Sequence, residues 1–489
     1  MKILPVSEWT FYKYRFQLGY GFLALVVALY ILLFSGLIPP GLSTTETQSL
    51  ITSTDLKLNE LPTAIVDLPY HLLQKASVEL LGVTPFGVRL PSMLFGILTA
   101  IFTALVLRRW MPSNVALISS LLMLTSGWFI GTARLGAPFI TIAFFSALVL
   151  LSATYISQQT KHWKRWKVVL AFTAALSLYS PFMIYLFAAA IIASFAQPHL
   201  RYLIRRSSKF HLTLGTLIFA LTLVPLGWGL YRDISQIWTL VAIPQDLPGP
   251  VQFFQNLVQA ASNFVNPFNI SFGEFVTPLV SLAAALFLVA GIVRILRDFH
   301  AIRTYLLLIW AALLIPIMGF NPNNLTVLMI PSFIVIAIGV QPIISYWYKI
   351  FPLNPYARVF GLIPLSLLLL TVIQFNDQRY TFGMLYSESA QQTFNSDLFL
   401  AQNELSKMPE DQLVFVVVPE IDKKLYQIEA SNRPNTTVVN PAEVNLQNGK
   451  WIIAESQINS VATLPAPVAT SVLVNDNATE ALRFRVFDR

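Results

Sequence analysis

Long apolar runs, separated by short polar segments, fill most of the chain. A helix of roughly 18 or more largely uncharged residues can cross a bilayer core of about 30 Å. The pattern predicts eleven such spans, near residues 17–38, 90–107, 113–131, 137–156, 166–179, 182–197, 211–231, 277–296, 303–320, 325–345 and 357–375. Only Tyr179-Ser180-Pro181 divides the fifth run from the sixth, so one kinked helix, and ten spans in total, is the alternative.

The pattern changes after Phe375, where short segments alternate apolar and polar residues. Alternation predicts strands, here over 412–418, 451–456, 471–474 and 482–487, with helices near 389–407 and 421–431. We therefore expect a polytopic α-helical membrane protein of about eleven transmembrane helices, followed by a small α/β domain. The predicted boundaries are 1–375 for the transmembrane domain and 376–489 for the soluble domain.

Charge predicts the orientation of the spans. With 55% hydrophobic and 11% charged residues the chain is too apolar to be soluble throughout. Eleven spans place 18 Lys and Arg on the side of the N-terminus and only five on the other side before residue 376. The positive-inside rule then makes the N-terminus cytoplasmic and the C-terminus extracytoplasmic, and we expect the plasma membrane of a prokaryote.

Composition also excludes some functions. Residues 1–375 carry a net charge of +13 and residues 376–489 a net charge of −5. Because the basic residues lie in short loops between spans, membrane orientation explains them better than nucleic-acid binding does. The chain has no cysteine, which excludes disulfides, thiolate metal sites and cysteine nucleophiles.

Two predicted external loops are long, residues 39–88 and 232–276, and long loops usually carry function or structure of their own. In the first, polar side chains recur every fourth residue at Asp67, His71, Lys75 and Glu79, beside Leu68, Leu72, Ala76 and Leu80. This spacing predicts an amphipathic helix at the membrane surface. Asp67 and His71 are candidate loop contacts to a ligand; their spacing would permit a two-ligand metal site, but a hydrated polar face is the simpler interpretation.

Three segments resemble a known family: GLIPPGLSTTETQSL (36–50), DLPYHLLQKASVELLGVTPFGVRLPSMLFGILTA (67–100) and TSGWFIGTARLGAPFITIAFFSALVLL (125–151). Their order is similar to that of the C-type glycosyltransferase superfamily, in its protein-mannosyltransferase and aminoarabinose-transferase-like branch. The element Gly82-Val-Thr-Pro-Phe-Gly-Val-Arg89-Leu-Pro-Ser92 matches that branch's Gly-x-x-x-x-x-x-Arg-Leu-Pro-Ser. The resemblance covers about the first 200 residues and implies transfer of a sugar from a polyprenyl-phosphate carrier to an acceptor on the outer face.

The resemblance suggests Glu46 as the general base. An external carboxylate would take the acceptor proton while the anomeric carbon is attacked. The family's acidic motif usually reads Asp-Glu, where this chain has Thr45-Glu46, and a second usual aspartate falls on Phe139. The alternative is that Glu46 is a solvated carboxylate at the start of a helix that follows Ser43.

Three arginines are candidates for binding the donor phosphate: Arg134, Arg232 and Arg89. Arginine suits this role because its planar guanidinium group donates paired hydrogen bonds to phosphate oxygens. Each has a structural alternative. Arg134 would otherwise mark the membrane interface, Arg232 would pair with Asp233, and Arg89 would anchor the start of a span beside Pro91.

The predicted function is therefore a membrane glycosyltransferase, a hexosyl- or pentosyltransferase, with a polyprenyl-phosphate sugar as donor. Membrane lipid and a glycan, lipid or protein acceptor are the expected partners, and nucleic acid is not. No cofactor is implied with certainty, although a divalent metal is possible. The alternatives are a catalytically inactive homologue that binds polyprenyl lipid or a partner protein, and a transporter, which would show mid-span charges or repeated halves.

Overall fold

The computed structural model describes most of the chain. It covers residues 14–488 except 35–40, 57–64, 161, 197, 199–200, 203–208, 267–270, 273, 277–278, 299–301, 323–324, 351–354, 388–389, 391–392, 410, 421, 431–432, 434, 441–448, 461–465 and 475–479. The chain divides into two compact units. The helical unit comprises Met1–Phe34, Lys57–Tyr70 and Pro91–Tyr380, and the mixed unit comprises Ser35–Leu56, His71–Leu90 and Thr381–Arg489.

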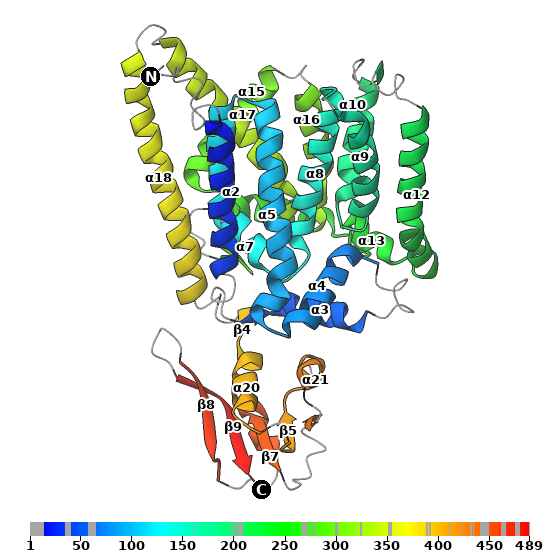
Figure 1. The fold of residues 1–489 in the computed structure, drawn as a ribbon, viewed down its shortest axis with the longest axis vertical. Helices are drawn as coiled ribbons and strands as arrows, with labels where there is room; N and C mark the ends of the chain where they lie inside the picture. The colour runs from blue at the N-terminus through cyan, green and yellow to red at the C-terminus, as the bar shows by residue number, and fades with distance from the viewer. Residues whose placement is uncertain are drawn as a thin grey trace, which may run out of the picture. The chain divides into compact units, whose positions relative to one another are not determined.

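Helices account for most of the described residues before residue 387. They are α2 (Arg15–Phe34), α3 (Thr44–Asp55), α4 (Leu68–Leu81), α5 (Pro85–Trp110), α6 (Ser113–Leu124), α7 (Gly127–Arg134), α8 (Phe139–Ser157), α9 (Trp163–Ser177), α10 (Met183–Ala196), α12 (Lys209–Arg232), α13 (Gln236–Val241), α14 (Pro250–Val265), α15 (Leu282–Arg297), α16 (Ile302–Phe320), the 3-10 helix η3 (Leu325–Leu328), α17 (Met329–Ile350) and α18 (Pro355–Tyr386). Figure 1 shows the helices of the helical unit packed side by side. Each predicted span overlaps one α-helix, except that 113–131 takes in both α6 and α7 and 325–345 takes in both η3 and α17. The predicted domain boundary at residue 376 falls inside α18.

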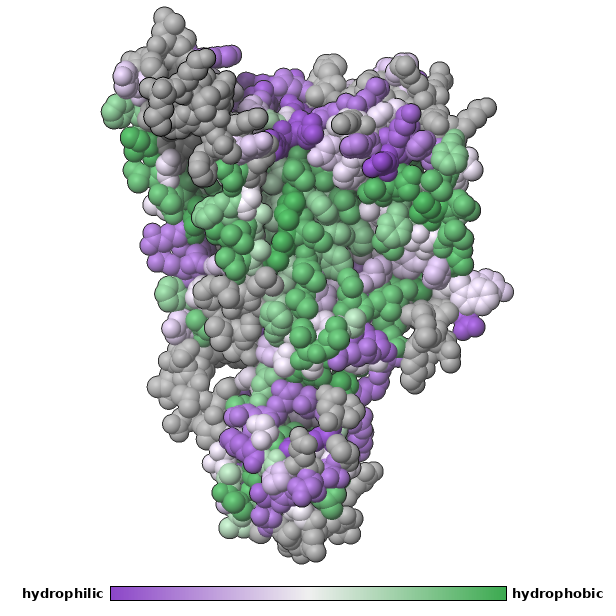
Figure 2. All heavy atoms as spheres, viewed as in Figure 1, coloured by the Kyte–Doolittle hydropathy of each residue, from purple (hydrophilic) through white to green (hydrophobic). Residues whose placement is uncertain are grey.

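Five of the described helices are long and apolar enough to cross a membrane: Pro85–Trp110, Phe139–Ser157, Phe210–Arg232, Arg303–Phe320 and Leu325–Trp347. The pair α6 and α7 makes a sixth if it is counted as one span. The chain thus has the architecture of a polytopic α-helical membrane protein. Figure 2 shows apolar side chains over the face of the helical unit seen in this view, with polar side chains gathered at one end of its helices.

The predicted third span, 113–131, is broken. Its two helices meet at a bend of 60°. α6 ends at Leu124 with Thr125 as its C-cap, and Ser126 starts a new helix by accepting a hydrogen bond from the Phe129 backbone N–H at 3.2 Å. A serine at the N-cap satisfies a backbone donor that would otherwise lack a partner. The apolar pattern continues through this break and so did not reveal it.

Residues 163–196 form two helices rather than one. α9 ends at Ser177 and α10 begins at Met183, and the turn between them contains Phe182 with a φ of 65°. α9 packs against α8 and α12, whereas α10 packs mainly against α16. The turn at Tyr179-Ser180-Pro181 therefore separates two packing environments.

The mixed unit contains a five-stranded sheet with the strand order β6-β5-β7-β9-β8. The strands are β5 (Val414–Val417), β6 (Thr436–Val439), β7 (Lys450–Ala454), β8 (Ala469–Val474) and β9 (Glu480–Asp488). β5 pairs in parallel with β6 and β7, and β9 pairs antiparallel with β7 and β8. The four predicted strands and both predicted helices, α20 (Asp397–Ser406) and α21 (Lys423–Ala430), are present, while β6 was not predicted.

Apolar side chains cover both faces of this sheet. Val414 and Val416 point into a core shared with α20 and α21, and Val417 and Trp451 belong to a second cluster on the opposite face. This alternation is the period of two expected for a strand. The short strand β1 (Leu42–Ser43) pairs antiparallel with β4 (Phe394–Asn395), so the first loop and the C-terminal region meet within the mixed unit.

Candidate active site

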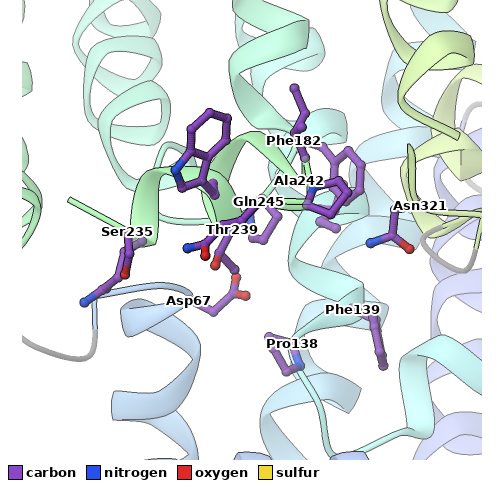
Figure 3. A pocket seen from close by; sticks show the side chains of 15 residues that line it. Asp67, Pro138, Phe139, Phe182, Ser235, Thr239, Ala242, Gln245 and Asn321 are labelled. Atoms are coloured by element: carbon purple, nitrogen blue, oxygen red, sulfur yellow. The ribbon is translucent and has the colours of Figure 1, made fainter. Parts of the chain in front are cut away.

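A cavity of about 490 Å³ lies in the helical unit, and five separate turns of the chain line it. Figure 3 shows side chains from these turns projecting into the same space. The lining comprises Asp67, Pro138, Phe139, Ile142, Pro181, Phe182, Ser235, Gln236, Trp238, Thr239, Ala242, Ile243, Pro244, Gln245 and Asn321. Concave sites with a few convergent polar groups are the usual form of small-molecule sites.

Asp67 is the one charged residue in this lining, and it is 6% exposed. The Thr141 hydroxyl donates to its carboxylate at 3.3 Å, and its backbone N–H donates to the Tyr179 carbonyl oxygen at 2.8 Å. Ser180 also hydrogen-bonds the carboxyl group. The sequence suggested that Asp67 lies on the polar face of a surface helix, but it precedes α4 and has a left-handed backbone with φ of 52°.

Left-handed backbone conformations cluster at this cavity. Of the four described non-glycine residues with positive φ, three line it: Asp67 at 52°, Phe182 at 65° and Ala242 at 59°. Such conformations are costly for residues with a Cβ atom and persist only where the surroundings impose them. Backbone hydrogen bonds hold two of them, from Phe182 N–H to the Leu240 carbonyl oxygen at 3.0 Å and from Ala242 N–H to the Thr239 carbonyl oxygen at 3.1 Å.

Burial raises the pKa of Asp67 from 3.8 to about 7, and the hydrogen bonds from Ser180 and Thr141 oppose this shift only in part. Removal from water disfavours the charged form of a carboxyl group. A carboxyl group with a pKa near neutral pH exchanges a proton efficiently, because both of its protonation states are populated. Asp67 therefore has the chemical character of a general base.

The rest of the lining is neutral. Amide and hydroxyl groups of Gln236, Gln245, Thr239 and Asn321 stand beside the apolar surface of Trp238. Amides and hydroxyls can donate and accept hydrogen bonds at once, which suits a ligand rich in hydroxyl groups. The lining contains no lysine or arginine and is poorly suited to hold a phosphate on its own.

The structure places Glu46 in a buried ion pair instead of at this cavity. Arg89 Nε donates to Glu46 Oε1 at 2.7 Å and Arg89 Nη2 to Oε2 at 3.1 Å, and both side chains are fully buried in the mixed unit. Glu46 Oε2 also accepts from the Ser43 backbone N–H at 3.0 Å, which completes a capping box at the start of α3. The helix-start alternative thus describes Glu46, although the group is buried rather than solvated.

Arg89 also donates to the Gly41 carbonyl oxygen at 2.5 Å. Its guanidinium group therefore joins the start of α3, the Gly41 turn and α5 within the mixed unit. A Cβ atom at Gly41 would lie 2.5 Å from the Asn395 carbonyl, so this turn requires glycine for close packing. These contacts agree with the anchor alternative for Arg89.

The other two predicted phosphate ligands differ in exposure. Arg134 is 1% exposed, donates to the Tyr30 carbonyl at 2.7 Å and stacks over the rings of Tyr30 and Tyr380. Arg232, at the end of α12, is exposed and lies over the Trp228 ring at 5.6 Å. Asp233 accepts hydrogen bonds from Ser235 and Gln236, so its carboxylate is engaged by the α13 turn.

His71 belongs to a buried polar network in the mixed unit. Its Nδ1 lies 2.9 Å from the Ser53 hydroxyl, and the hydroxyls of Ser49 and Ser53 donate to Gln74. Burial lowers the pKa of His71 to about 4, against an opposing hydrogen bond with Gln74, so the ring is neutral at neutral pH. No group of three or more His, Asp or Glu suited to a metal occurs among the described residues.

The prediction of an outward polar face holds for Glu79, whose side chain is 66% exposed, but is wrong for Asp67 and His71, which are buried. His71, Gln74 and Ser77 are buried, whereas Leu72 is 45% exposed and Leu80 84% exposed. The polar side chains pair with α3 and with backbone groups of α5, which leaves the leucines outward. An outward apolar face still agrees with a helix at a membrane surface.

Sequence reasoning missed Ser235, Gln236, Thr239, Gln245 and Asn321 as site residues. The length of the 232–276 loop was a signal for the first four of these residues, whereas no sequence pattern indicated Asn321. Gln236 shows how the turns are joined, because its side-chain oxygen accepts from the Ile65 N–H at 3.3 Å.

Comparisons with known proteins agree with the resemblance found in the sequence. The family model of dolichyl-phosphate-mannose-protein mannosyltransferases matches residues 69–228. This segment includes Arg89, Arg134 and the turns at Pro138 and Pro181, but not Glu46 or Asp67. A search of curated protein sequences gave no match.

Two solved structures share the fold over nearly the whole chain. ArnT from Cupriavidus metallidurans in the apo state is 15% identical, with a TM-score of 0.54 over 96% of this chain and 98% of that chain. The same protein bound to undecaprenyl phosphate is 14% identical, with a TM-score of 0.55 and the same coverage. The Archaeoglobus fulgidus oligosaccharyltransferase tethered to an acceptor peptide is 12% identical, with a TM-score of 0.51 over 90% of this chain and 65% of that chain. The predicted resemblance to the C-type glycosyltransferase superfamily is confirmed.

Proposed function

We propose that this protein is a membrane glycosyltransferase that moves a sugar from a polyprenyl-phosphate donor to an acceptor, with Asp67 as the general base. One observation carries the assignment of the site: a buried carboxyl group with a pKa of about 7 lies on a cavity lined by neutral hydrogen-bonding groups. The family match and the shared fold support the class of reaction. In this proposal the base role passes from Glu46 to Asp67, because Arg89 engages both oxygens of Glu46.

The reaction balances with these groups. An acceptor hydroxyl attacks the anomeric carbon of the donor sugar and gives its proton to the Asp67 carboxylate. The bond between the anomeric carbon and the phosphate oxygen breaks, and its electron pair leaves with the polyprenyl phosphate. Proton transfer by a positioned side chain typically contributes about 10²–10⁴-fold to the rate.

Among the three predicted arginines we propose Arg232 as the contact to the departing phosphate. It is exposed and lies three residues before Ser235, which lines the cavity. Arg89 and Arg134 are buried against carboxylate, carbonyl and aromatic groups, so we assign them to holding the fold.

We further propose eleven spans in the plasma membrane of a prokaryote, with the cytoplasmic N-terminus and extracytoplasmic C-terminal domain that charge predicts. The cavity lining supports this topology. Asp67, Pro138, Pro181, Ser235–Gln245 and Asn321 come from the five turns that an eleven-span chain places on its external side. With ten spans the turns at Ser235–Gln245 and Asn321 would lie on the opposite side of the membrane from Asp67 and Pro138.

The test is to incubate the purified protein in detergent with radiolabelled polyprenyl-phosphate hexoses or pentoses and to measure sugar leaving the lipid. We expect Asp67→Asn to lower the rate by at least about 10²-fold while donor binding persists. Asp246→Asn is the matched control, since this exposed carboxylate lies beside Gln245 but outside the lining. Full activity of Asp67→Asn would remove the proposed base, and loss of activity in Glu46→Gln at unchanged thermal stability would return the role to Glu46.

A catalytically inactive homologue is the second candidate. Two observations favour it. Arg89 engages the Glu46 carboxylate, and Thr45 and Phe139 stand where the resembled family usually has aspartate. Such a protein would bind polyprenyl phosphate but release no sugar from any donor, in the wild type as in every variant.

A further inference from the structure

A second cavity, of about 360 Å³, lies in the helical unit where α15 ends and α16 begins. Its lining comprises Arg294, Ile295, Arg297, Asp298, Arg303, Thr304 and Ile338. Three guanidinium groups and one carboxylate give this small space an excess of positive charge. None of these residues contributes to the proposed transferase site.

The three arginines are held in different ways. Arg303 donates to the Trp110 carbonyl oxygen at 2.7 Å, which fixes its position. Its charge is repelled by that of Arg294 and attracted by that of Asp298. The Arg294–Asp298 pair, at 3.4 Å, is 33% and 64% exposed and is therefore weak in water. A bound anion would relieve the remaining repulsion and accept hydrogen bonds from the arginines.

An apolar stripe leads away from this cavity along α15. Leu282, Leu286, Val289, Val293 and Leu296 recur every three or four residues, and each is at least 45% exposed. The opposite face of α15, with Phe287 and Gly291, packs against α17. The stripe runs over 15 residues, from Leu282 to Leu296, or roughly 21 Å of helix, which exceeds half of the apolar thickness of a bilayer.

We propose that this cavity binds the phosphate group of an anionic glycerophospholipid, whose acyl chain lies along the exposed stripe of α15. The juxtaposition of three cationic groups with a lipid-length apolar track favours a lipid over a free anion. The same charge pattern that predicts orientation places these arginines on the cytoplasmic side, where anionic lipids attract basic residues. The contact of Arg303 with Trp110 agrees, because it joins the α15–α16 turn to the Arg108–Arg109 end of α5.

The experiment measures lipid affinity of the full-length protein by native mass spectrometry and by thermal shift in mixed micelles. Phosphatidylglycerol is compared with phosphatidylcholine and with inorganic phosphate alone. The variants are Arg294→Gln with Arg297→Gln, Arg297→Gln alone, and Lys349→Gln. Lys349 is the matched control, because it is an exposed cation on the same predicted side and outside the cavity.

We expect the wild type to prefer phosphatidylglycerol, the double variant to lose about thirtyfold in affinity, and Lys349→Gln to bind as the wild type does. Arg297→Gln alone should lose part of the affinity. Because this variant changes an exposed side chain, it provides the test of the site if the double variant does not fold. Equal losses in Lys349→Gln would show a general charge effect and overturn the site. Equal stabilisation by inorganic phosphate alone would show a free-anion site and overturn the lipid assignment, as would unchanged binding in both arginine variants.

Discussion

At the scale of single residues, Asp67 combines burial, a left-handed backbone and a place on a cavity wall. Burial alone would favour an apolar residue here, since a carboxyl group is costly to remove from water. The hydroxyls of Thr141 and Ser180 reduce that cost without supplying a positive charge. The result is a carboxyl group that gains and loses its proton near neutral pH.

This pKa predicts the pH dependence of transfer. Because a base must be ionised, and the pKa of Asp67 is raised to about 7, the rate should rise about tenfold per pH unit below pH 7 and level off above it. The residual rate of Asp67→Asn should lack this limb. Initial rates at saturating donor, measured from pH 5 to pH 9, check the prediction; a wild-type rate that stays constant from pH 5 to pH 7 would contradict it.

Thermal stability gives an independent measure of the same group. The folded protein holds the Asp67 proton more tightly than the unfolded chain does, so ionisation between pH 3.8 and about 7 lowers the free energy of unfolding. In Asp67→Asn the free energy of unfolding should therefore fall less than in the wild type as the pH rises through this range. The thermal midpoints of both proteins at pH 5 and pH 8 provide the comparison.

The Glu46–Arg89 pair predicts a different response. Removing one partner leaves a buried charge or polar group unpaired, which costs about 3–5 kcal/mol. Glu46→Gln and Arg89→Met should therefore each destabilise the protein strongly, and the double variant should lose less than the sum of both. Denaturation of the three variants tests this coupling, and additive losses would mean that the pair does not act as a unit.

At the scale of elements, the apolar pattern predicted where helices occur but not how they bend or which face is buried. α6 and α7 are divided by the Ser126 cap inside one apolar run. α4 buries its polar face because Ser49, Ser53 and Gln74 satisfy one another's hydrogen bonds, and no periodicity reveals such pairing. The short edge strand β6, with the sequence TTVV, was missed because four residues carry little alternation.

Close packing of α15 against α17 depends on two glycines. A Cβ atom at Gly339 would lie 1.9 Å from the Phe287 carbonyl oxygen, and one at Gly291 would lie 2.0 Å from the Val335 carbonyl oxygen. Small residues at such crossings let helix backbones approach within a membrane. The separation of the two helices is therefore set by glycine.

Gly339→Ala should destabilise the protein by about 1–3 kcal/mol, because the added methyl group has no space. Gly227→Ala in α12 is the matched control: nothing lies within 4 Å of its Cβ position, and alanine favours a helix more than glycine does. Thermal unfolding in detergent should show a lower midpoint for Gly339→Ala than for the wild type. The midpoint of Gly227→Ala should not be lower than that of the wild type. A tolerated Gly339→Ala would mean that α15 and α17 can separate at little cost.

At the scale of the whole molecule, the charge distribution and the cavity lining depend on the same topology. Basic residues predict one side of the membrane, and the five turns around Asp67 belong to the other side in an eleven-span chain. The number of apolar runs could be predicted from the sequence. The cavity could not, because it joins turns that are up to 254 residues apart, from Asp67 to Asn321, and no local pattern encodes such distances.

The absence of cysteine from the chain makes this topology directly testable. Gln158→Cys lies before the turn at Ser180, and Gln245→Cys lies after it; both positions are exposed. With eleven spans a membrane-impermeant maleimide should label Gln245→Cys in intact cells, and Gln158→Cys only after the membrane is opened. If α9 and α10 together crossed the membrane only once, both positions would lie inside, and neither would be labelled in intact cells. Labelling of Gln245→Cys from outside would place the Asp67 cavity on the side where an extracytoplasmic acceptor can reach it, whereas its protection would leave the proposed base facing the cytoplasm and exclude external transfer at this site.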